Sequence, residues 1–150
     1  MADKLKVFLC HASENKSIVQ ALHDDLKAAG YEPWLDKEIL LYGQNWEREI
    51  KLALKQTDAV IVCFSAKLVN KEGYIQKELR LAEAEADEKL PGSIFLIPLK
   101  LDVCDVPFEF QHLHWGDYTA PDAFGDLVTA LNTRARQLGK KEGKAKKKRP

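Results

Sequence analysis

The fold of this chain is decided by Ala59-Val60-Ile61-Val62-Cys63-Phe64-Ser65, together with Gly73-Tyr74-Ile75-Gln76-Lys77-Glu78-Leu79 shortly after it. The first run is apolar almost to its end, a pattern typical of a strand buried on both faces of a parallel sheet. The second run lies in a helix predicted over about Lys71 to Lys89. In an open α/β sheet, ligands bind outside the carboxyl ends of the strands. The stretch therefore places a carboxylate, Glu78, early on a helix beside that edge.

Glu78 is expected at the border of the helix's buried stripe. A helical wheel centres the stripe on Ile75 and puts Glu78 about 60° to one side of it, one turn after Tyr74. Helical glutamates such as Glu83 and Glu88 are ordinarily solvated. Position alone therefore leaves two interpretations of Glu78 open, a surface residue and a residue that acts on a ligand.

Strand and helix patterns alternate outward from this stretch. The expected strands are Leu5–Cys10, Glu32–Leu35, Ala59–Ser65, Ser93–Leu99 and His112–Trp115. The expected helices are one from an N-cap at Ser13 to a stop at Gly30, one from Trp46, one over about Lys71–Lys89 and one over Ala120–Gln137. This alternation predicts a flavodoxin-like, three-layer α/β/α domain with a five-stranded parallel sheet in the order 2-1-3-4-5.

Three of these helices carry apolar residues at spacings of three and four, which predict their buried faces. The expected faces are Ile18, Ala21, Leu22, Leu26 and Ala29; Trp46, Ile50, Ala53 and Leu54; and Phe124, Leu127, Val128 and Leu131.

The net charge of zero conceals an asymmetry between the body and the end of this 150-residue chain. Residues 139–150 carry seven basic side chains and one acidic, whereas residues 1–138 carry 16 basic and 22 acidic. We therefore expect one domain over residues 1–138 and a disordered, solubilising basic tail over residues 139–150. Binding of the tail to nucleic acid or an anionic membrane is the alternative, and no interleaved aromatic residues support it.

Cysteine usage and hydropathy indicate a cytoplasmic protein. Cys10, Cys63 and Cys104 are widely spaced and odd in number, which suits reduced, buried thiols. The few residues before the first strand are too short for a signal peptide, and no run is long enough to span a bilayer.

Other chemistries find little support in the motifs. The chain has neither GxGxxG nor GxxxxGK[ST], the phosphate-binding patterns of dinucleotide-binding and P-loop proteins. His112 and His114 share one face of the expected strand, but no third metal ligand accompanies them. Cys10 before His11 is better explained as a core residue than as a nucleophile. A phosphoacceptor receiver would need an Asp where Ser65 stands.

Several motifs, in this order, make the chain resemble a TIR domain of the kind found in bacteria and in plant and animal innate immunity. Lys6–Glu14 resembles the first box of that family, and Trp34–Trp46 resembles its second box and the loop after the second strand. Ala59–Ser65 with Tyr74–Leu79 resembles the third strand and the helix that bears the family's catalytic glutamate. The resemblance extends over about Leu5 to Arg136.

The resemblance implies an enzyme that cleaves NAD⁺ between nicotinamide and ribose, giving ADP-ribose or a cyclic isomer, with Glu78 as the catalytic carboxylate. NAD⁺ would be the substrate, and no cofactor would be needed. The family's pattern also implies self-assembly with other TIR domains, a role in antiphage or immune-type signalling, and a separate sensor or effector protein as partner. The residues expected to line the nucleotide pocket are His11, Ala12, Ser13, Asp36, Lys37, Ile39, Leu40, Trp46, Ser65 and Tyr74.

Several of these residues also have structural interpretations. Ser13 is at least as well explained as a helix N-cap, Trp46 as a core residue, and Ser65 as a cap of the next helix. Two other functions stay open. One is a non-catalytic adaptor that binds other TIR domains, and the other is an enzyme resembling nucleoside deoxyribosyltransferases, which also use a carboxylate.

Overall fold

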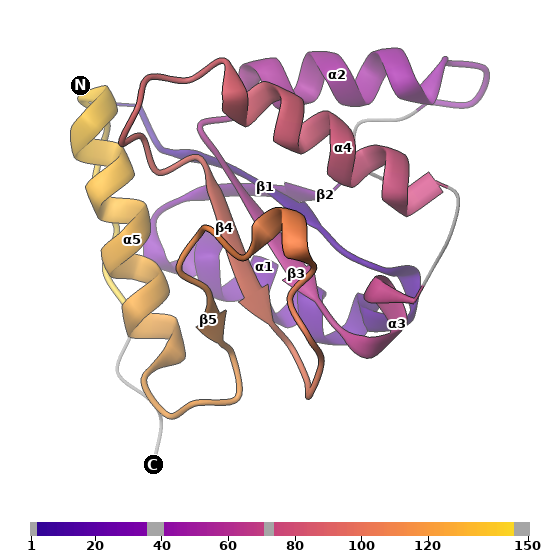
Figure 1. Cartoon of the computed structure of the whole chain (residues 1–150). Helices are drawn as coiled ribbons and strands as arrows, with labels where there is room; N and C mark the ends of the chain where they lie inside the picture. The colour runs from indigo at the N-terminus through magenta and orange to yellow at the C-terminus, as the bar shows by residue number, and fades with distance from the viewer. Residues whose placement is uncertain (1–2, 36–40, 71–73, 146–150) are drawn as a thin grey trace.

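Five parallel strands form one sheet in the computed structural model, which describes residues 3–35, 41–70 and 74–145, and only the backbone of Tyr74 and Ile75. The strands are β1 (Lys6–Cys10), β2 (Glu32–Leu35), β3 (Ala59–Phe64), β4 (Leu96–Lys100) and β5 (Gly116–Asp117). The α-helices are α1 (Lys16–Ala29), α2 (Trp46–Gln56), α3 (Ala66–Val69), α4 (Tyr74–Asp87) and α5 (Ala123–Leu138), and the 3₁₀ turns are η1 (Ser13–Asn15) and η3 (Phe108–Phe110). The order β2-β1-β3-β4-β5 confirms the predicted fold and topology (Figure 1).

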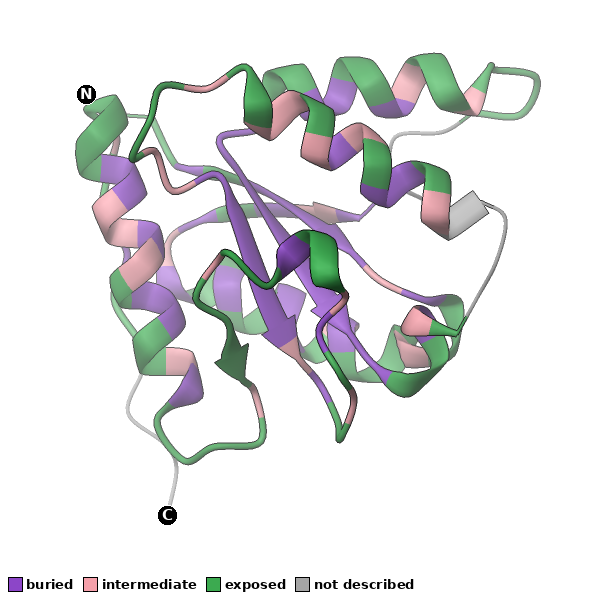
Figure 2. Ribbon diagram, viewed as in Figure 1, coloured by how far each residue is buried: buried purple, intermediate pink, exposed green. Residues whose placement is uncertain are grey.

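The sheet separates two apolar cores (Figures 1 and 2). Alternate residues of each strand face α1 and α5 on one side and α2 and α4 on the other. Every residue of β3 is buried, as expected for a central parallel strand. Thus Ile61 and Cys63 pack under α1 and α5, whereas Val60 and Val62 pack under α2 and α4.

The first helix begins later than the sequence suggested, and its predicted buried face is right only in part: Leu22, Leu26 and Ala29 are buried. Ser13 opens η1, and its hydroxyl donates to the Glu14 carboxylate (2.9 Å), so the predicted N-cap is wrong. Ile18 and Ala21 are exposed, because the buried stripe runs through Val19 and is completed by a polar residue, His23. A pattern of apolar residues alone does not identify a buried stripe that includes a polar residue. Gly30 ends the helix at a φ of 109°, as predicted for a left-handed cap.

The predicted faces of the second and last helices agree with the structure. Ile50, Ala53 and Leu54 are buried on α2, and Trp46 is half-buried. Asn45 caps α2 by accepting a hydrogen bond from the backbone N–H of Arg48 (3.1 Å). The buried residues of α5 include Leu127, Val128 and Leu131, and Phe124 packs against them.

Two strand boundaries were predicted wrongly. β4 starts at Leu96, three residues later than expected, because the Gln137 side chain holds the preceding turn through Gly92 O (3.2 Å) and Ile94 N (3.1 Å). The last strand is not His112–Trp115 but Gly116–Asp117, since the chain turns through η3 before it reaches the edge of the sheet. His112 and His114 therefore lie in a loop and not on a strand face.

Residues 139–145, which we call the C-terminal strap, lie against the body of the domain. The Lys141 N–H donates to Asp3 O (2.9 Å), and the Lys144 N–H donates to Ala29 O (2.9 Å). Asn132 on α5 bonds both the N–H and the C=O of Gly143 (2.8 and 2.9 Å). The structure therefore differs from the expected tail over the strap, where backbone hydrogen bonds offset the ordering of a charged segment. The rest of that tail, residues 146–150, lies outside the described residues.

Candidate functional site

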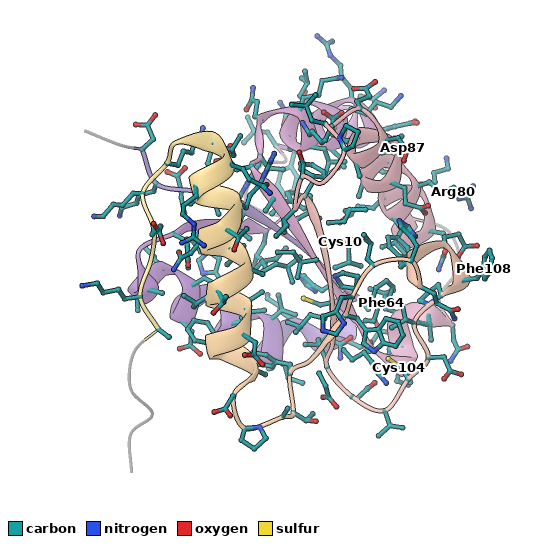
Figure 3. The ribbon with its side chains drawn as sticks, turned by 60° about the vertical axis from the view of Figure 1, so that its left-hand side comes forward. Cys10, Phe64, Arg80, Asp87, Cys104 and Phe108 are labelled. Carbon is teal, nitrogen blue, oxygen red and sulfur yellow. The ribbon has the colours of Figure 1, made fainter. Side chains whose placement is uncertain are left out.

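Glu78 is the most informative polar residue at the carboxyl edge of the sheet. It is the fifth residue of α4, and its exposed fraction is 1%. Arg80 and Asp87 on the same helix point outward into solvent (Figure 3). Burial of a carboxylate removes it from water and is rare, so a buried Glu indicates either a structural network or a functional site.

An apolar cluster surrounds this part of α4. Leu79 and Ala82 pack beneath the helix, in the core that also contains Ala12 after β1 and Leu68 on α3. These residues come from the segments that follow β1 and β3, so the cluster joins the carboxyl ends of neighbouring strands to the start of α4. Glu78 is thus placed on an apolar scaffold and not on a flexible surface helix.

Trp46 is the first residue of α2, and its ring faces α4. Its side chain is half-buried and packs against the same cluster, in agreement with its interpretation as a core residue. The ammonium of Lys77 lies over the indole ring, 6.0 Å from its centroid. This contact links the start of α2 to α4 at the residue before Glu78. The sequence interpretation missed Lys77, which no strand-end pattern would have identified.

The segment after β1 turns sharply at the carboxyl edge. Ala12 is buried, His11 is half-buried and Ser13 is exposed. The Nδ1 atom of His11 lies 2.8 Å from Ala12 O, and the Asn15 N–H donates to the same carbonyl (3.0 Å). The segment is therefore a hydrogen-bonded turn that leads through η1 into α1.

Ser65 connects this turn to the end of β3. Its hydroxyl is fully buried, donates to Asn15 Oδ1 (2.6 Å) and accepts from the Leu68 N–H (3.1 Å). Ser65 therefore caps α3, one of the two roles that the sequence left open. Asp102, which follows β4, accepts from the Ala66 N–H (3.0 Å) at the same edge. Asn15 and Asp102 were missed, although the rule that polar groups gather after strand ends applies to Asp102.

A hollow opens on this edge between η1 and α3. It has a volume of about 370 Å³ and is lined by Glu14, Ala66, Lys67 and Asn70. A larger cavity of about 550 Å³ lies at the other end of the sheet, beside the start of β4, and its lining includes Glu83, His112 and His114. Burial, followed by the nearby carboxylates of Glu109 and Asp87, raises the pKa of Glu83 there.

Five residues predicted for the site fall wholly or partly outside the described part of the chain. Asp36, Lys37, Ile39 and Leu40 lie outside the described residues, as does the side chain of Tyr74. Among the described residues, Ala12 and Trp46 belong to or pack against one core. Ser65 and Glu78 are buried, whereas Ser13 is exposed.

The thiols are poor candidates for nucleophiles. Burial raises the pKa of Cys63 to about 12, and burial, followed by the carboxylate of Asp102, raises the pKa of Cys104. Cys10 is fully buried in the core, as Figure 3 illustrates. A nucleophilic cysteine needs a lowered pKa and access to its substrate. A carboxylate is therefore a better candidate for the catalytic group at this edge than a thiol is.

The family model described as TIR domain matches residues 7–129. A comparison with curated proteins returned no match. None of the helices in the described residues is both long and apolar enough to cross a membrane.

Solved structures of several kinds of protein are similar to this fold. The TIR domain of the Toll-related receptor TRR-2 from Hydra magnipapillata has a TM-score of 0.70 and 20% identity, over 83% of this chain and 96% of that one. A prokaryotic SEFIR domain has a TM-score of 0.66 and 17% identity, over 85% of this chain and 92% of that one. The TIR domains of the activated Roq1 resistosome have a TM-score of 0.55 and 19% identity, over 89% of this chain and 84% of that one. At these identities the likeness concerns the fold.

Proposed function

The chain belongs to the TIR domain family, and on that premise we propose that it cleaves NAD⁺ at the bond between nicotinamide and ribose. The observation that carries this proposal is the burial of Glu78 to 1% exposure, in the first turns of α4 and beside the carboxyl edge of the sheet. A carboxylate in a water-poor site interacts strongly with any positive charge that develops next to it. Cleavage of NAD⁺ develops such a charge on the ribose.

A single carboxylate is sufficient for this reaction. The bond from the ribose carbon to the pyridinium nitrogen breaks with its electron pair moving to nitrogen, so nicotinamide leaves as a neutral molecule without a proton donor. The ribose passes through an oxocarbenium-like transition state, as in glycoside hydrolysis. Glu78 would stabilise this cation or hold a ribose hydroxyl. Attack by water then gives ADP-ribose and a proton, whereas attack by a nitrogen of the adenine gives a cyclic product.

The surrounding residues support this role by holding the edge rigid. The hydrogen bond between Ser65 and Asn15 ties the turn after β1 to the end of β3, and Asp102 ties α3 to the segment after β4. We assign the walls of the nucleotide pocket to the turn at His11 and Ala12 and to the loop after β2. Such pre-organisation lowers the free energy needed to orient the ribose.

We assign assembly of copies to the end of the loop after β2. Leu41 and Tyr42 have exposed fractions of 73% and 109%. They are held outward by a turn in which the Leu41 N–H donates to Gln44 Oε1 (2.6 Å) and the Gln44 N–H to Leu41 O (3.1 Å). Gly43 at φ 89° allows that turn. Two adjacent bulky apolar side chains on a fixed turn are suited to bury against a neighbouring copy.

The experiment that tests the activity follows nicotinamide release from NAD⁺ by purified protein at high concentration. We expect the wild type to release nicotinamide, Glu78→Gln to release none above background, and Glu83→Gln, a matched change on the same helix, to retain the wild-type rate. Retained activity in Glu78→Gln, or none in a correctly folded wild type, would overturn the proposal. Deoxynucleosides tested in parallel identify a deoxyribosyltransferase-like activity.

Assembly is tested by the dependence of the rate per copy on protein concentration. We expect Tyr42→Asp to abolish the rise in specific activity at high concentration. Leu90→Asp, which changes another side chain with 80% exposure, should leave that rise intact. NMR of the reaction mixture then identifies the linear or cyclic product.

A non-catalytic adaptor is the second candidate, and the exposed pair Leu41 and Tyr42 favours it as well, because association needs no chemistry. The two functions separate cleanly. An adaptor would self-associate through Tyr42 without releasing nicotinamide, and Glu78→Gln would leave its association unchanged. The free thiols Cys10, Cys63 and Cys104 support a reducing compartment, such as the cytoplasm, for either function.

A further inference from the structure

The outer edge of β4 is only partly covered by β5. In a parallel ladder, alternate residues direct both their N–H and their C=O to the same neighbouring strand. Phe95 O accepts from the Val60 N–H (2.7 Å), so the odd-numbered residues of this segment bond to β3. Lys100 O accepts from the Tyr118 N–H (2.8 Å), so the even-numbered residues face β5. Leu96 therefore directs both of its backbone groups to the β5 side.

β5 is too short to pair with Leu96. Within the described part of the chain, its two residues pair only with Leu99 and Lys100, at the carboxyl-terminal end of β4 (Figure 1). Leu96 begins β4 and has an exposed fraction of 8%. Backbone N–H and C=O groups that are shielded from water are nearly always hydrogen-bonded in folded proteins. The edge at Leu96 is therefore suited to pair with a further strand.

The cavity beside the start of β4 lies at this edge. Its volume of about 550 Å³ is in the range of ligand sites, and its lining includes Leu96 and Ile97. Glu83 and Asp87 of α4 line it on one side of the sheet, and Ala130 of α5 lines it on the other side. The cavity therefore extends around the edge of the sheet, where a strand added to β4 would lie.

The α4 side of this cavity is negatively charged. Burial, followed by the carboxylates of Glu109 and Asp87, raises the pKa of Glu83, so three carboxylates lie near one another. Arg80 and His112 are near enough to oppose this shift, and they offset part of the charge. An added cation would be stabilised by the carboxylates that remain.

Lys89 also lines the cavity, but its charge is already compensated. Its ammonium lies 3.2 Å from Glu85 Oε1 and over the ring of Phe95, 4.8 Å from the centroid. Lys89 is therefore held at the floor of the cavity and does not neutralise Glu83 and Asp87.

We propose that the edge of β4 at Leu96 binds an extended segment of a partner protein with basic residues at alternate positions. The segment adds a strand to the sheet by pairing with the N–H and C=O of Leu96. Successive side chains of a strand point to opposite faces of the sheet. Those on the same face as Leu96 meet Glu83 and Asp87, and those on the other face meet Ala130. Basic residues suit the first face, and apolar residues suit the second.

This edge is separate from the proposed NAD⁺ site. Leu96 lies at the amino end of β4, whereas Glu78 lies early on α4, towards the carboxyl edge of the sheet. The proposal therefore does not depend on the cleavage of NAD⁺.

The test titrates the full chain into a fluorescein-labelled peptide, Gly-Val-Lys-Val-Lys-Val-Gly, and follows fluorescence anisotropy. We expect the wild type to bind it, and to bind a peptide with glutamates in place of the lysines at least about 10-fold more weakly. Glu83→Gln/Asp87→Asn should weaken binding of the lysine peptide by about 5-fold, as for two partly exposed ion pairs. Glu32→Gln/Glu47→Gln, an equal change at exposed carboxylates of β2 and α2, should leave its affinity unchanged.

Two methylated peptides test the backbone pairing. The backbone nitrogens of the lysines and of the valines lie on opposite edges of an extended peptide, and only one edge faces β4. One peptide is methylated on both lysine nitrogens, and the other on the nitrogens of the valines that follow them. One of the two should bind at least about 10-fold more weakly and the other should bind as before. The Leu96 amide should exchange at least about 10-fold more slowly with saturating peptide, as measured by NMR.

The proposal is overturned if the wild type does not bind the lysine peptide, if the two methylated peptides bind equally, or if the exchange of the Leu96 amide does not change. It is overturned in favour of a small cation if N-acetyl-lysine amide competes as well as the unlabelled peptide does. It is overturned in favour of a second copy if the wild type alone self-associates and Glu83→Gln/Asp87→Asn is monomeric. The thermal midpoint of each double variant checks its folding.

Discussion

The two ends of the parallel sheet both hold charged or polar groups away from water, but in different ways. At the amino end, Asp58 Oδ2 accepts from the Lys6 N–H (2.8 Å) and from Lys140 Nζ (2.7 Å). Arg134 donates from Nε to Asp58 O (2.8 Å), and burial lowers its pKa while the Asp58 carboxylate opposes this. At the carboxyl end, Glu78 is buried in the first turns of α4. Hydrogen bonds of Ser65 and Asp102 hold the turns at that end.

The different surroundings of Asp58 and Glu78 indicate which of these two buried carboxylates stabilises the fold. The partners of Asp58 come from β1, α5 and the C-terminal strap, so this carboxylate joins segments that are distant in the sequence. Glu78 comes after a strand end and early in a helix, where open α/β sheets bind ligands. We therefore interpret Asp58 as structural and Glu78 as functional, and exchange of each carboxylate for its amide tests that distinction.

The largest effect is expected for Glu78→Gln. Loss of a preorganised charge that stabilises the transition state should lower kcat/KM for NAD⁺ by about 1,000-fold, or about 4 kcal/mol. Because Gln has the same shape and carries no buried charge, the free energy of unfolding should stay within about 1 kcal/mol of wild type or rise. Nicotinamide release and urea unfolding of the same preparation measure both quantities. A stability loss as large as that of Asp58→Asn would make Glu78 a structural residue.

Asp58→Asn is expected to show the opposite pattern. The amide removes the negative charge that faces Lys140 and Arg134, and it should lower the free energy of unfolding by about 2 kcal/mol. Activity per folded molecule should be unchanged, because Asp58 lies at the far end of the sheet. Urea titration, with nicotinamide release measured well below the unfolding midpoint, checks both. A drop in activity without a drop in stability would contradict our assignment.

The fold could be predicted because its signals are local and redundant. The fully apolar run of β3, the glycine that ends α1 and the spacing on α2 each agree with the final structure. The errors arose where tertiary contacts override pattern. The start of β4 depends on Gln137, which is 41 residues after Leu96, and the position of the strap depends on Asn132 and Asp58.

The candidate site was predictable only in part. The position of Glu78 followed from a strand end and a helical period, but its near-complete burial depends on how α4 packs on the sheet. The cap formed by Ser65 was one of two open roles, and its bond to Asn15 joins residues 50 apart. A contact between residues so far apart in the sequence leaves no pattern in the sequence around either residue.

Gly143→Ala tests the anchoring of the strap at the amino end. A Cβ atom there would lie 2.6 Å from Tyr31 Cζ and 2.7 Å from Ala29 O, so the strap must shift and weaken its bonds to Asn132. We expect a loss of about 1 to 2 kcal/mol in the free energy of unfolding. Gly125→Ala is the matched control, because its Cβ would meet no atom within 4 Å in a helix, and there Ala should stabilise the protein by up to about 1 kcal/mol. Equal unfolding midpoints for the two variants would show that the strap adds no stability.

The smallest effect is expected for Tyr31→Phe, and it varies with pH. The Tyr31 hydroxyl donates to Asn132 Oδ1 (2.7 Å) and lies 3.3 Å from Val128 O, so its removal should cost about 1 kcal/mol near neutral pH. Burial, with the Glu142 carboxylate nearby, raises the pKa of Tyr31 from 10.0 to about 12. Between these values the unfolded chain loses the tyrosine proton while the folded protein keeps it, so the contribution of Tyr31 to stability falls as the pH rises. Urea unfolding of both proteins at several pH values from 9 upward should therefore show the wild-type advantage shrinking above pH 10. A constant difference across that range would mean that the hydroxyl stays accessible to water, and the strap would then not seal the amino end of the sheet.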